Sequence, residues 1–180
     1  MILLVGSSAS GKTALSVLLR EKYGLLKTVT YTTRKPRIGE KDGLDYHFVS
    51  KNLFNEMRSR NEFVETTDYN GNSYGSSKNE ISDNKVLIVD PSGLKAYKML
   101  RNPEIISFYL EASEESRINR MKERKDSPEN IKARIENDKK VFSLAVEEEC
   151  DFIIQTDDRS LEAIADEVYK KYQETLKAHS

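Results

Sequence analysis

The residues with the clearest chemistry form the run Gly6-Ser7-Ser8-Ala9-Ser10-Gly11-Lys12-Thr13 near the N-terminus. This run matches the pattern G-x-x-x-x-G-K-[ST], and it lies between a short apolar stretch, residues 2–5, and a segment with helical periodicity. Its glycines let backbone N–H groups turn toward phosphate oxygens, and the helix that follows adds a favourable dipole. Lys12 would reach the β- and γ-phosphates, and the Thr13 hydroxyl would ligate Mg²⁺. The sequence therefore predicts that Gly6 to Ala14 bind a nucleoside triphosphate with magnesium.

A second group of basic residues follows in the run Thr32-Thr33-Arg34-Lys35-Pro36-Arg37. Two guanidinium groups three residues apart, with a rigid proline between them, are suited to holding one phosphate dianion. Tyr46 and Tyr74 offer hydroxyl donors farther along the chain. Taken singly, each has a plainer interpretation, a solvated basic loop for the arginines and half-buried strand positions for the tyrosines.

Apolar runs and helical segments alternate at both ends of the chain, and these elements must position the candidate residues. Short apolar runs at 2–5, 86–89, 105–110 and 152–154 are typical of strands buried on both faces of a parallel sheet. Helical periodicity or end signals mark 13–23, 94–101, the start at Ser127-Pro128 and the segment from Ser160. The sequence therefore predicts an α/β fold, a three-layer core around a parallel sheet with right-handed crossovers.

The middle of the chain departs from this alternation in two places. Residues 28–84 are rich in Thr, Tyr, Asn and Gly and contain short strand-like pieces at 28–32, 46–49 and 63–67. They predict a small mixed insertion standing on the sheet. Residues 111–140 are rich in Lys and Arg with few apolar positions, and they predict a mobile helical lid. One domain, 1–180, would then comprise a core (1–27, 85–110 and 141–180), the insertion (28–84) and the lid (111–140).

Composition excludes several classes of function. The chain has 180 residues with 29 Lys plus Arg and 30 Asp plus Glu, a formal net charge of −1, which argues against nucleic-acid and membrane-surface partners. A single cysteine, Cys150, makes neither an intrachain disulfide nor a structural zinc site, and the sequence gives no reason for a reactive thiol. The apolar N-terminal run is too short for a signal peptide or a membrane span. We expect a cytoplasmic protein that is a monomer or a homodimer.

Several blocks of residues, taken in order, resemble guanylate kinases over residues 2 to about 160. They are the phosphate-loop run, Thr32-Thr33-Arg34-Lys35-Pro36-Arg37-Ile38-Gly39-Glu40, Gly43-Leu44-Asp45-Tyr46-His47-Phe48-Val49, Glu62-Phe63-Val64-Glu65 and Gly71-Asn72-Ser73-Tyr74-Gly75-Ser76. The second and third blocks are specific to that family rather than to phosphate-loop proteins in general. The resemblance implies transfer of the γ-phosphoryl group of MgATP to GMP, or also dGMP, in a fold of core, monophosphate-binding insertion and lid.

The resemblance also implies roles for individual residues. The acceptor phosphate of GMP would be held by Arg34, Arg37, Tyr46 and Tyr74. The base would be contacted by Glu65, Ser76 and Thr30. A carboxylate accepts two hydrogen bonds and guanine offers two adjacent donors, whereas adenine presents a ring acceptor at N1 and would be rejected.

Three lid arginines and one aspartate complete the implied site. Arg120, Arg124 and Arg134 match arginines that close over the triphosphate, and with Lys12 and Arg34 they form the expected catalytic set. Asp90 matches the second carboxylate of a D-x-D motif near the nucleotide and the metal, which it would contact through water. No general base is needed, because the acceptor is already an anionic phosphate oxygen.

The chain departs from the family pattern at several positions. Ser7 replaces the usual proline, Ala9 the usual glycine and Ile88 the first aspartate of D-x-D, while Thr156 stands where an asparagine often contacts adenine. Two other functions are compatible with such a sequence. One is a related kinase acting on ribose bisphosphate, for which Glu65 and Ser76 would have no use. The other is a non-catalytic guanylate-kinase-like module that binds proteins, in which the phosphate loop is typically damaged.

Overall fold

A five-stranded parallel sheet forms the centre of the molecule in the computed structural model, which describes residues 1–179. Its strands are β1 (Ile2–Val5), β2 (Leu26–Lys27), β7 (Lys85–Ile88), β8 (Ile106–Glu111) and β9 (Phe152–Gln155), and they lie in the order β2-β7-β1-β8-β9. Every printed pairing in this sheet is parallel. The predicted α/β core is therefore confirmed, although the prediction lacked the two-residue edge strand β2 and a short helix at Leu144–Glu148.

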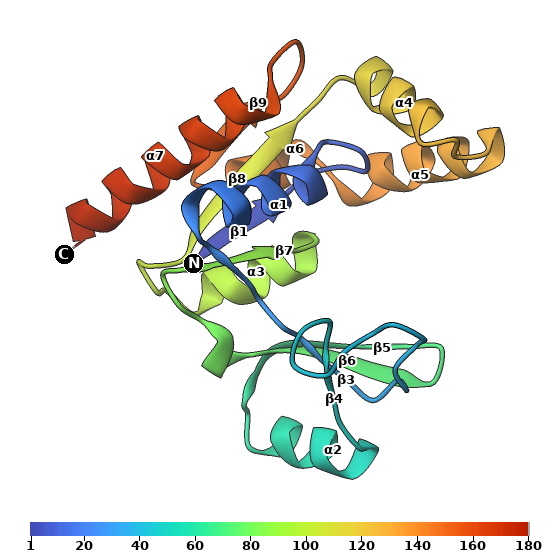
Figure 1. Ribbon diagram of the computed structural model, residues 1–180, viewed down its shortest axis with the longest axis vertical. Helices are drawn as coiled ribbons and strands as arrows, with labels where there is room; N and C mark the ends of the chain where they lie inside the picture. Colours follow the sequence, from blue (N-terminus) through green and yellow to red (C-terminus); the bar gives the residue numbers. More distant parts are fainter. Residues whose placement is uncertain (180) are drawn as a thin grey trace.

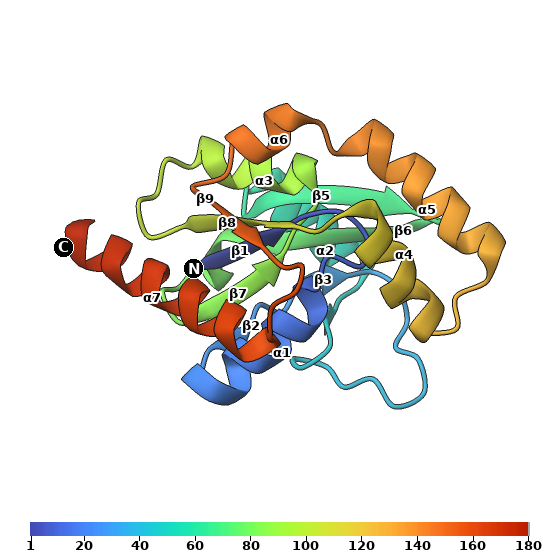
Figure 2. The same ribbon diagram turned by 90° about the horizontal axis from the view of Figure 1, so that it is seen from above.

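Helices cover both faces of this sheet, so the core has three layers (Figure 2). The helices α1 (Lys12–Tyr23) and α7 (Leu161–His179) pack on one face, where Ile2 and Leu4 of β1 point. The helices α3 (Pro91–Met99) and α6 (Leu144–Glu148) pack on the other face, with Leu3 and Val5. Because successive residues of a strand point to opposite faces, an uninterrupted apolar run is what a strand covered on both sides needs.

A second sheet stands apart from the core (Figure 1). It consists of β3 (Tyr31–Thr32), β4 (His47–Phe48), β5 (Phe63–Tyr69) and β6 (Asn72–Ser77), in the order β4-β3-β6-β5. Phe54 and Met57 of α2 (Lys51–Ser59) pack on Phe63 of β5 to form its own small core. A short 3-10 turn at Lys78–Glu80 follows β6 on the way back to the central sheet. The sequence predicted the mixed character of this region but not α2 or β6.

Two helices, α4 (Glu114–Glu123) and α5 (Pro128–Val141), pack together beside the core, at the opposite end of the molecule from the C-terminus (Figure 1). Ser113 and Ser127 cap them, each accepting a hydrogen bond from the backbone N–H three residues on, and Pro128 occupies the first turn of α5 as predicted. Met121, Ile131 and Ile135 form the apolar contact between the two helices.

The parallel arrangement brings the carboxyl ends of the central strands to one edge of the sheet. The phosphate loop follows β1, Asp90 lies shortly after β7, and Thr156 follows β9. Ligands of open parallel sheets bind at this edge. Among residues 1–179, no helix has the length and apolar character needed to cross a membrane.

Candidate active site

The phosphate loop is closed around its own lysine. The Nζ of Lys12, at the start of α1, donates to the carbonyl oxygens of Gly6 at 2.5 Å and Ser7 at 2.8 Å. Gly6 has φ 145°, and a Cβ there would lie 2.6 Å from the carbonyl oxygen of Leu110, so this position requires glycine. Ala9, the departure from the usual glycine, has φ 61°. Gly6, Ala9 and Gly11 thus all have positive φ values in this loop.

The ammonium of Lys12 is partly removed from water. Burial lowers the pKa of Lys12 to about 8, an effect that the Asp138 carboxylate opposes and the cations Arg117 and Arg124 reinforce. A lysine surrounded by other cations is stabilised by an arriving anion, because the anion favours its charged form. The loop is thus electrostatically prepared for a phosphate group.

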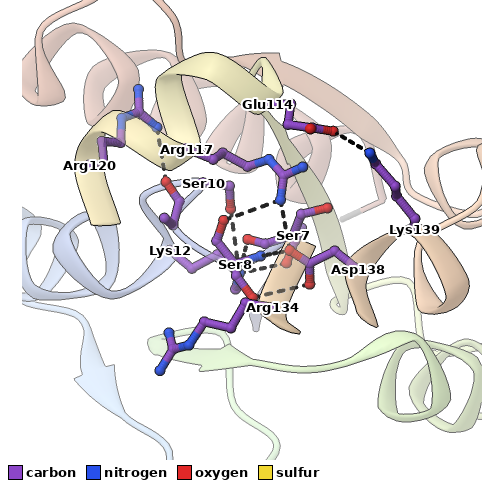
Figure 3. Close-up of polar contacts among 12 residues, drawn as sticks. Ser7, Ser8, Ser10, Lys12, Glu114, Arg117, Arg120, Arg134, Asp138 and Lys139 are labelled. Atoms are coloured by element: carbon purple, nitrogen blue, oxygen red, sulfur yellow. Dashed lines mark hydrogen bonds and ion pairs between the residues drawn. The ribbon is translucent and has the colours of Figure 1, made fainter. Parts of the chain in front are cut away.

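The helices α4 and α5, which lie in the predicted lid, contact the phosphate loop directly (Figure 3). Asp138 of α5 accepts hydrogen bonds from the backbone N–H of Ser8 at 2.9 Å and from its hydroxyl at 3.1 Å. Arg117 of α4 forms an ion pair with the same carboxylate at 2.7 Å. Neither residue was among the sequence candidates.

The three predicted lid arginines take different positions. Arg120 donates to the carbonyl oxygens of Ala9 at 3.2 Å and Thr156 at 3.0 Å, so it joins the phosphate loop to the end of β9. The Nε of Arg124 donates to the backbone of Arg120 at 3.3 Å. Arg134 is half exposed, lies 4.0 Å from Asp126, and in Figure 3 extends away from Arg117 and Asp138. Of these three arginines, Arg120 is the one with a hydrogen bond to the phosphate loop.

A pocket of about 270 Å³ lies beside the loop and has largely apolar walls. Leu15, Leu110 and Ile164 form these walls, and Arg120 and Thr156 supply polar groups. Such a pocket, with apolar walls and a few polar groups, suits a nucleoside base next to the phosphate loop. Thr156 itself is buried, and its hydroxyl donates to the carbonyl oxygen of Glu111 at 3.1 Å.

A separate cleft of about 290 Å³ lies between the core and the loop residues of the insertion that flank β3 and β4. Its lining includes Thr13 of the phosphate loop, Thr30 and Tyr46 of the insertion, and Ile88 at the end of β7. Ile88, which replaces an expected aspartate, is partly exposed there. The cleft therefore brings predicted donor-side and acceptor-side residues into one space.

The predicted phosphate-holding arginines are organised by Glu40, the last residue of the block that contains them, to which the sequence analysis gave no role. The carboxylate of Glu40 accepts from Nη2 of Arg34 at 2.8 Å and from the backbone N–H of Arg37 at 2.7 Å. Arg34 also lies over the Tyr46 ring, 5.5 Å from its centroid, and the rings of Tyr46 and Tyr74 are 6.2 Å apart in an edge arrangement. Arg34, Tyr46 and Tyr74 are therefore brought together, with Arg37 on the same loop.

The predicted base-reading pair is assembled across two antiparallel strands. The hydroxyl of Ser76 in β6 donates to Oε1 of Glu65 in β5 at 2.7 Å, where the two residues are register partners. A β-bulge between Phe63 and Glu65 shifts the register just before this pair. Thr30 lies near the start of β3, where its carbonyl oxygen accepts from the backbone N–H of His47 at 2.9 Å.

Asp90 has a structural function in the fold. It is the N-cap of α3, and its Oδ1 accepts from the backbone N–H of Gly93 at 2.8 Å and from the Ser92 hydroxyl at 3.0 Å. Within residues 1–179, no cluster of three His, Cys, Asp or Glu side chains could hold a metal ion. A divalent ion at this site would therefore need oxygen ligands from a phosphate chain in addition to those of the protein.

His47 and Cys150, whose types are common in catalytic sites, have structural surroundings here. The Nε2 atom of His47 lies 3.6 Å from Oε1 of Glu80, and the ring is in contact with that of Tyr31. Burial raises the pKa of the Cys150 thiol to about 12, so that thiol stays protonated and unreactive at neutral pH.

A pattern in the sequence could have indicated Arg117 and Asp138, which were not among the predicted site residues. The buried positions of α5 are Ile131, Ile135 and Asp138, a spacing of i, i+4 and i+7, and those of α4 are Arg117 and Met121. A charged residue in the apolar stripe of each of two consecutive helices is a signal for a buried ion pair.

Comparison with known proteins identifies the family. The family model described as guanylate kinase matches residues 1–179. A guanylate kinase of Caulobacter vibrioides is 34% identical over 186 residues, covering 98% of this chain and 86% of that protein. A guanylate kinase of Nostoc sp. is 33% identical over 173 residues, covering 91% of this chain and 86% of that protein.

Solved structures agree with the fold. A crystal structure of guanylate kinase from Anaplasma phagocytophilum aligns with a TM-score of 0.60 at 23% identity, covering 96% of this chain and 84% of that one. Shikimate kinase from Acinetobacter baumannii aligns with a TM-score of 0.54 at 15% identity, covering 96% of this chain and 92% of that one. With a phosphate loop, an arginine-bearing insertion and a helical lid on one parallel core, and with relatives matched over nearly its whole length, the chain belongs to the guanylate kinase family.

Proposed function

We propose that this protein transfers the γ-phosphoryl group of MgATP to GMP, giving ADP and GDP. The observation that carries the proposal is the cleft that joins Thr13 of an intact phosphate loop to Thr30 and Tyr46 of the insertion. Two phosphorylated ligands, one on each side of this cleft, would meet end to end. dGMP is a further candidate acceptor.

ATP would be held by Gly6 to Ala14, with its base in the pocket between Leu15, Leu110 and Ile164. The backbone N–H groups of the loop and the start of α1 favour the phosphates, and Lys12 would contact the β- and γ-phosphates. Arg120, already on the loop, would be joined by Arg124 and Arg134 when the lid closes.

The hydroxyl of Thr13 fits a magnesium ion, because it is exposed at the first turn of α1 beside the phosphate loop. Asp90 is available as a water-mediated contact through the carboxylate oxygen not used in its N-cap. A magnesium ion held there would supply positive charge that offsets the negative charge developing on the phosphates during transfer.

The acceptor phosphate would lie on Arg34, Arg37, Tyr46 and Tyr74. Glu40 keeps the Arg34 guanidinium and the Arg37 backbone oriented before the substrate arrives, which reduces the entropy lost on binding. Guanine would present its N1–H and amino group to Glu65, while Ser76 and Thr30 contribute hydroxyl groups to the same pocket.

The reaction needs positioning and charge neutralisation more than proton transfer. An oxygen of the GMP phosphate attacks the γ-phosphorus, the bond between that phosphorus and the β,γ-bridging oxygen breaks, and ADP leaves with the electron pair. Lys12, Arg34 and the lid arginines would stabilise the negative charge on the transferring group. A closed lid would also exclude water and so limit hydrolysis of ATP.

The two alternative functions lack a supporting observation. A ribose bisphosphate has no base for the Glu65–Ser76 pair to contact. A non-catalytic protein-binding module has no use for a phosphate loop whose lysine, glycines and hydroxyl are all in place. We therefore propose small-molecule nucleotide partners, without nucleic acid or membrane, and a cytoplasmic monomer or homodimer divided into the core, insertion and lid defined above.

The test is ADP release from MgATP in the presence of GMP, dGMP, AMP, CMP, UMP or ribose bisphosphate, with Lys12→Ala as the blank. Turnover with GMP, alone or with dGMP, is the expected result. Turnover with the sugar phosphate but no nucleotide would replace the proposal with the first alternative. No turnover with any acceptor would favour the protein-binding module.

A further inference from the structure

Two charged side chains are buried where the lid meets the phosphate loop. Arg117 is 7% exposed and Asp138 is 4% exposed, and their ion pair measures 2.7 Å. Buried ion pairs contribute little to stability on average, because the desolvation of both charges offsets their attraction. A buried pair at this place therefore needs an explanation other than stability.

The pair holds one residue of the phosphate loop from two sides. The two carboxylate oxygens of Asp138 accept from the N–H and the hydroxyl of Ser8, and Nη1 of Arg117 lies 3.5 Å from the Ser8 carbonyl oxygen. Ser8 lies between the two glycines that shape the loop. Its position therefore depends on both lid helices at once.

We propose that Arg117 and Asp138 are positioning residues for the phosphate loop, which set the affinity for MgATP through Ser8. The inference rests on one part of the proposed function, namely that the phosphate loop binds MgATP. Asp138 fixes Ser8, and Arg117 neutralises a carboxylate that would otherwise face the incoming triphosphate. Neither residue touches the cleft lining that includes Thr30 and Tyr46, so the pair has no effect on GMP affinity.

The two residues are not equivalent in this arrangement. Removing Arg117 leaves an unpaired carboxylate beside the phosphate loop, where it repels phosphate and loses its own counter-ion. Removing Asp138 loses the contacts to Ser8 but leaves no negative charge. Arg117→Met is therefore expected to weaken MgATP binding by about 10-fold or more, and Asp138→Ala by about 3- to 5-fold, the size expected when an ordinary hydrogen bond is lost. The double variant should return to the level of Asp138→Ala.

A matched control joins the same two helices. Lys139 of α5 and Glu114 of α4 form an ion pair at 2.9 Å, but their side chains are 62% and 45% exposed and lie on the outer side of the lid (Figure 3). Glu114→Gln removes a lid ion pair without changing any contact to Ser8. MgATP affinity should stay within about 2-fold of the unchanged protein, as is usual for exposed pairs.

The experiment measures MgATP binding by calorimetry without GMP, and KM for each substrate with both present. Arg117→Lys keeps the charge and should fall between the unchanged protein and Arg117→Met, whereas KM for GMP should stay within about 2-fold throughout. A purely structural role would lower the melting temperature and the active fraction without separating the two KM values.

Three results would overturn the inference. One is unchanged MgATP affinity in a folded Arg117→Met protein, the second is a double variant no better than Arg117→Met, and the third is an equal loss in Glu114→Gln. If Arg117→Met does not fold, Asp138→Ala alone decides, because unchanged MgATP affinity there contradicts the contact to Ser8. Calorimetry does not require turnover, so the inference can hold or fail independently of GMP phosphorylation.

Discussion

The donor side and the acceptor side of the proposed site are built in opposite ways. The phosphate loop is one run of consecutive residues, closed by Lys12 on its own carbonyl oxygens and covered by the lid. The acceptor side is spread from Thr30 to Ser76 over strands and loops, and Glu40 holds its arginines. The first arrangement depends on local backbone conformation, whereas the second depends on correct pairing of the second sheet.

The main cations of the two sides, Lys12 and Arg34, also differ in their surroundings. Burial lowers the pKa of Lys12, but the hydrogen bond to Glu40 raises the pKa of Arg34, which keeps its charge at every physiological pH. The charged form of a buried cation is stabilised when an anion binds beside it, whereas a cation that is already paired keeps its charge and a fixed side-chain orientation. ATP binding on the donor side should therefore depend on pH, whereas GMP binding on the acceptor side should depend on how the Arg34 side chain is oriented.

Lys12→Ala should have the largest effect, because it removes both the cation for the phosphates and the internal closure of the loop. We expect phosphoryl transfer to fall by about 100- to 1000-fold, the range found for a lost transition-state donor. The measurement is GMP-dependent ADP release, with Lys22→Ala, at the other end of α1, as the control. Retention of more than a tenth of the activity would contradict the role of Lys12.

Glu65→Gln tests the acceptor side alone. The amide group of Gln would place a donor against one of the two donors of guanine, so KM for GMP should rise by about 10- to 100-fold while KM for ATP stays constant. Steady-state kinetics with each substrate varied in turn measures the difference. The control is Glu62→Gln. Glu62 directly precedes β5 and forms an ion pair with Arg60. Equal changes in both KM values would show that the variant disturbs more than the base pocket.

The pH dependence should separate the two sides without a mutation. Lys12 has a pKa of about 8 in the free protein, so it loses its proton as the pH rises through that value. The kcat/KM for ATP should then fall, approaching tenfold per pH unit well above pH 8, whereas kcat at saturating ATP should fall less because bound phosphate raises the pKa of the lysine. A flat profile up to pH 9.5 would assign the lysine an ordinary pKa.

Glu40→Gln should have the smallest effect of the four. Gln keeps one acceptor for Arg34 or for the Arg37 N–H but loses the charge, and the side chains of the pair are still 16% and 20% exposed to water, so KM for GMP should rise by about 3- to 10-fold. Glu56→Gln, in the exposed Glu56–Arg60 pair of α2, is the matched control. If both variants behave alike, Glu40 does not organise the arginine loop.

Much of the core could be predicted because its signals are local. The apolar runs at β1, β7, β8 and β9 and the glycine and proline signals at the helix ends gave strand and helix positions within a few residues. The helix α2 was missed because only Phe54 and Met57 of its nine residues are buried, and β6 because Asn72 to Ser77 carry no apolar alternation. Those two elements are stabilised by packing on Phe63 and by pairing with β5.

The sequence by itself determined the phosphate loop, the parallel core and the order of the acceptor motifs, because each depends on residues close together in the chain. Only the tertiary structure decided which side chains meet across long separations. Ser8 and Asp138 are 130 positions apart, and no spacing rule predicts a hydrogen bond between them. The burial of Arg117 and Asp138 is possible only because two helices fold onto the loop and each side chain satisfies the other's charge.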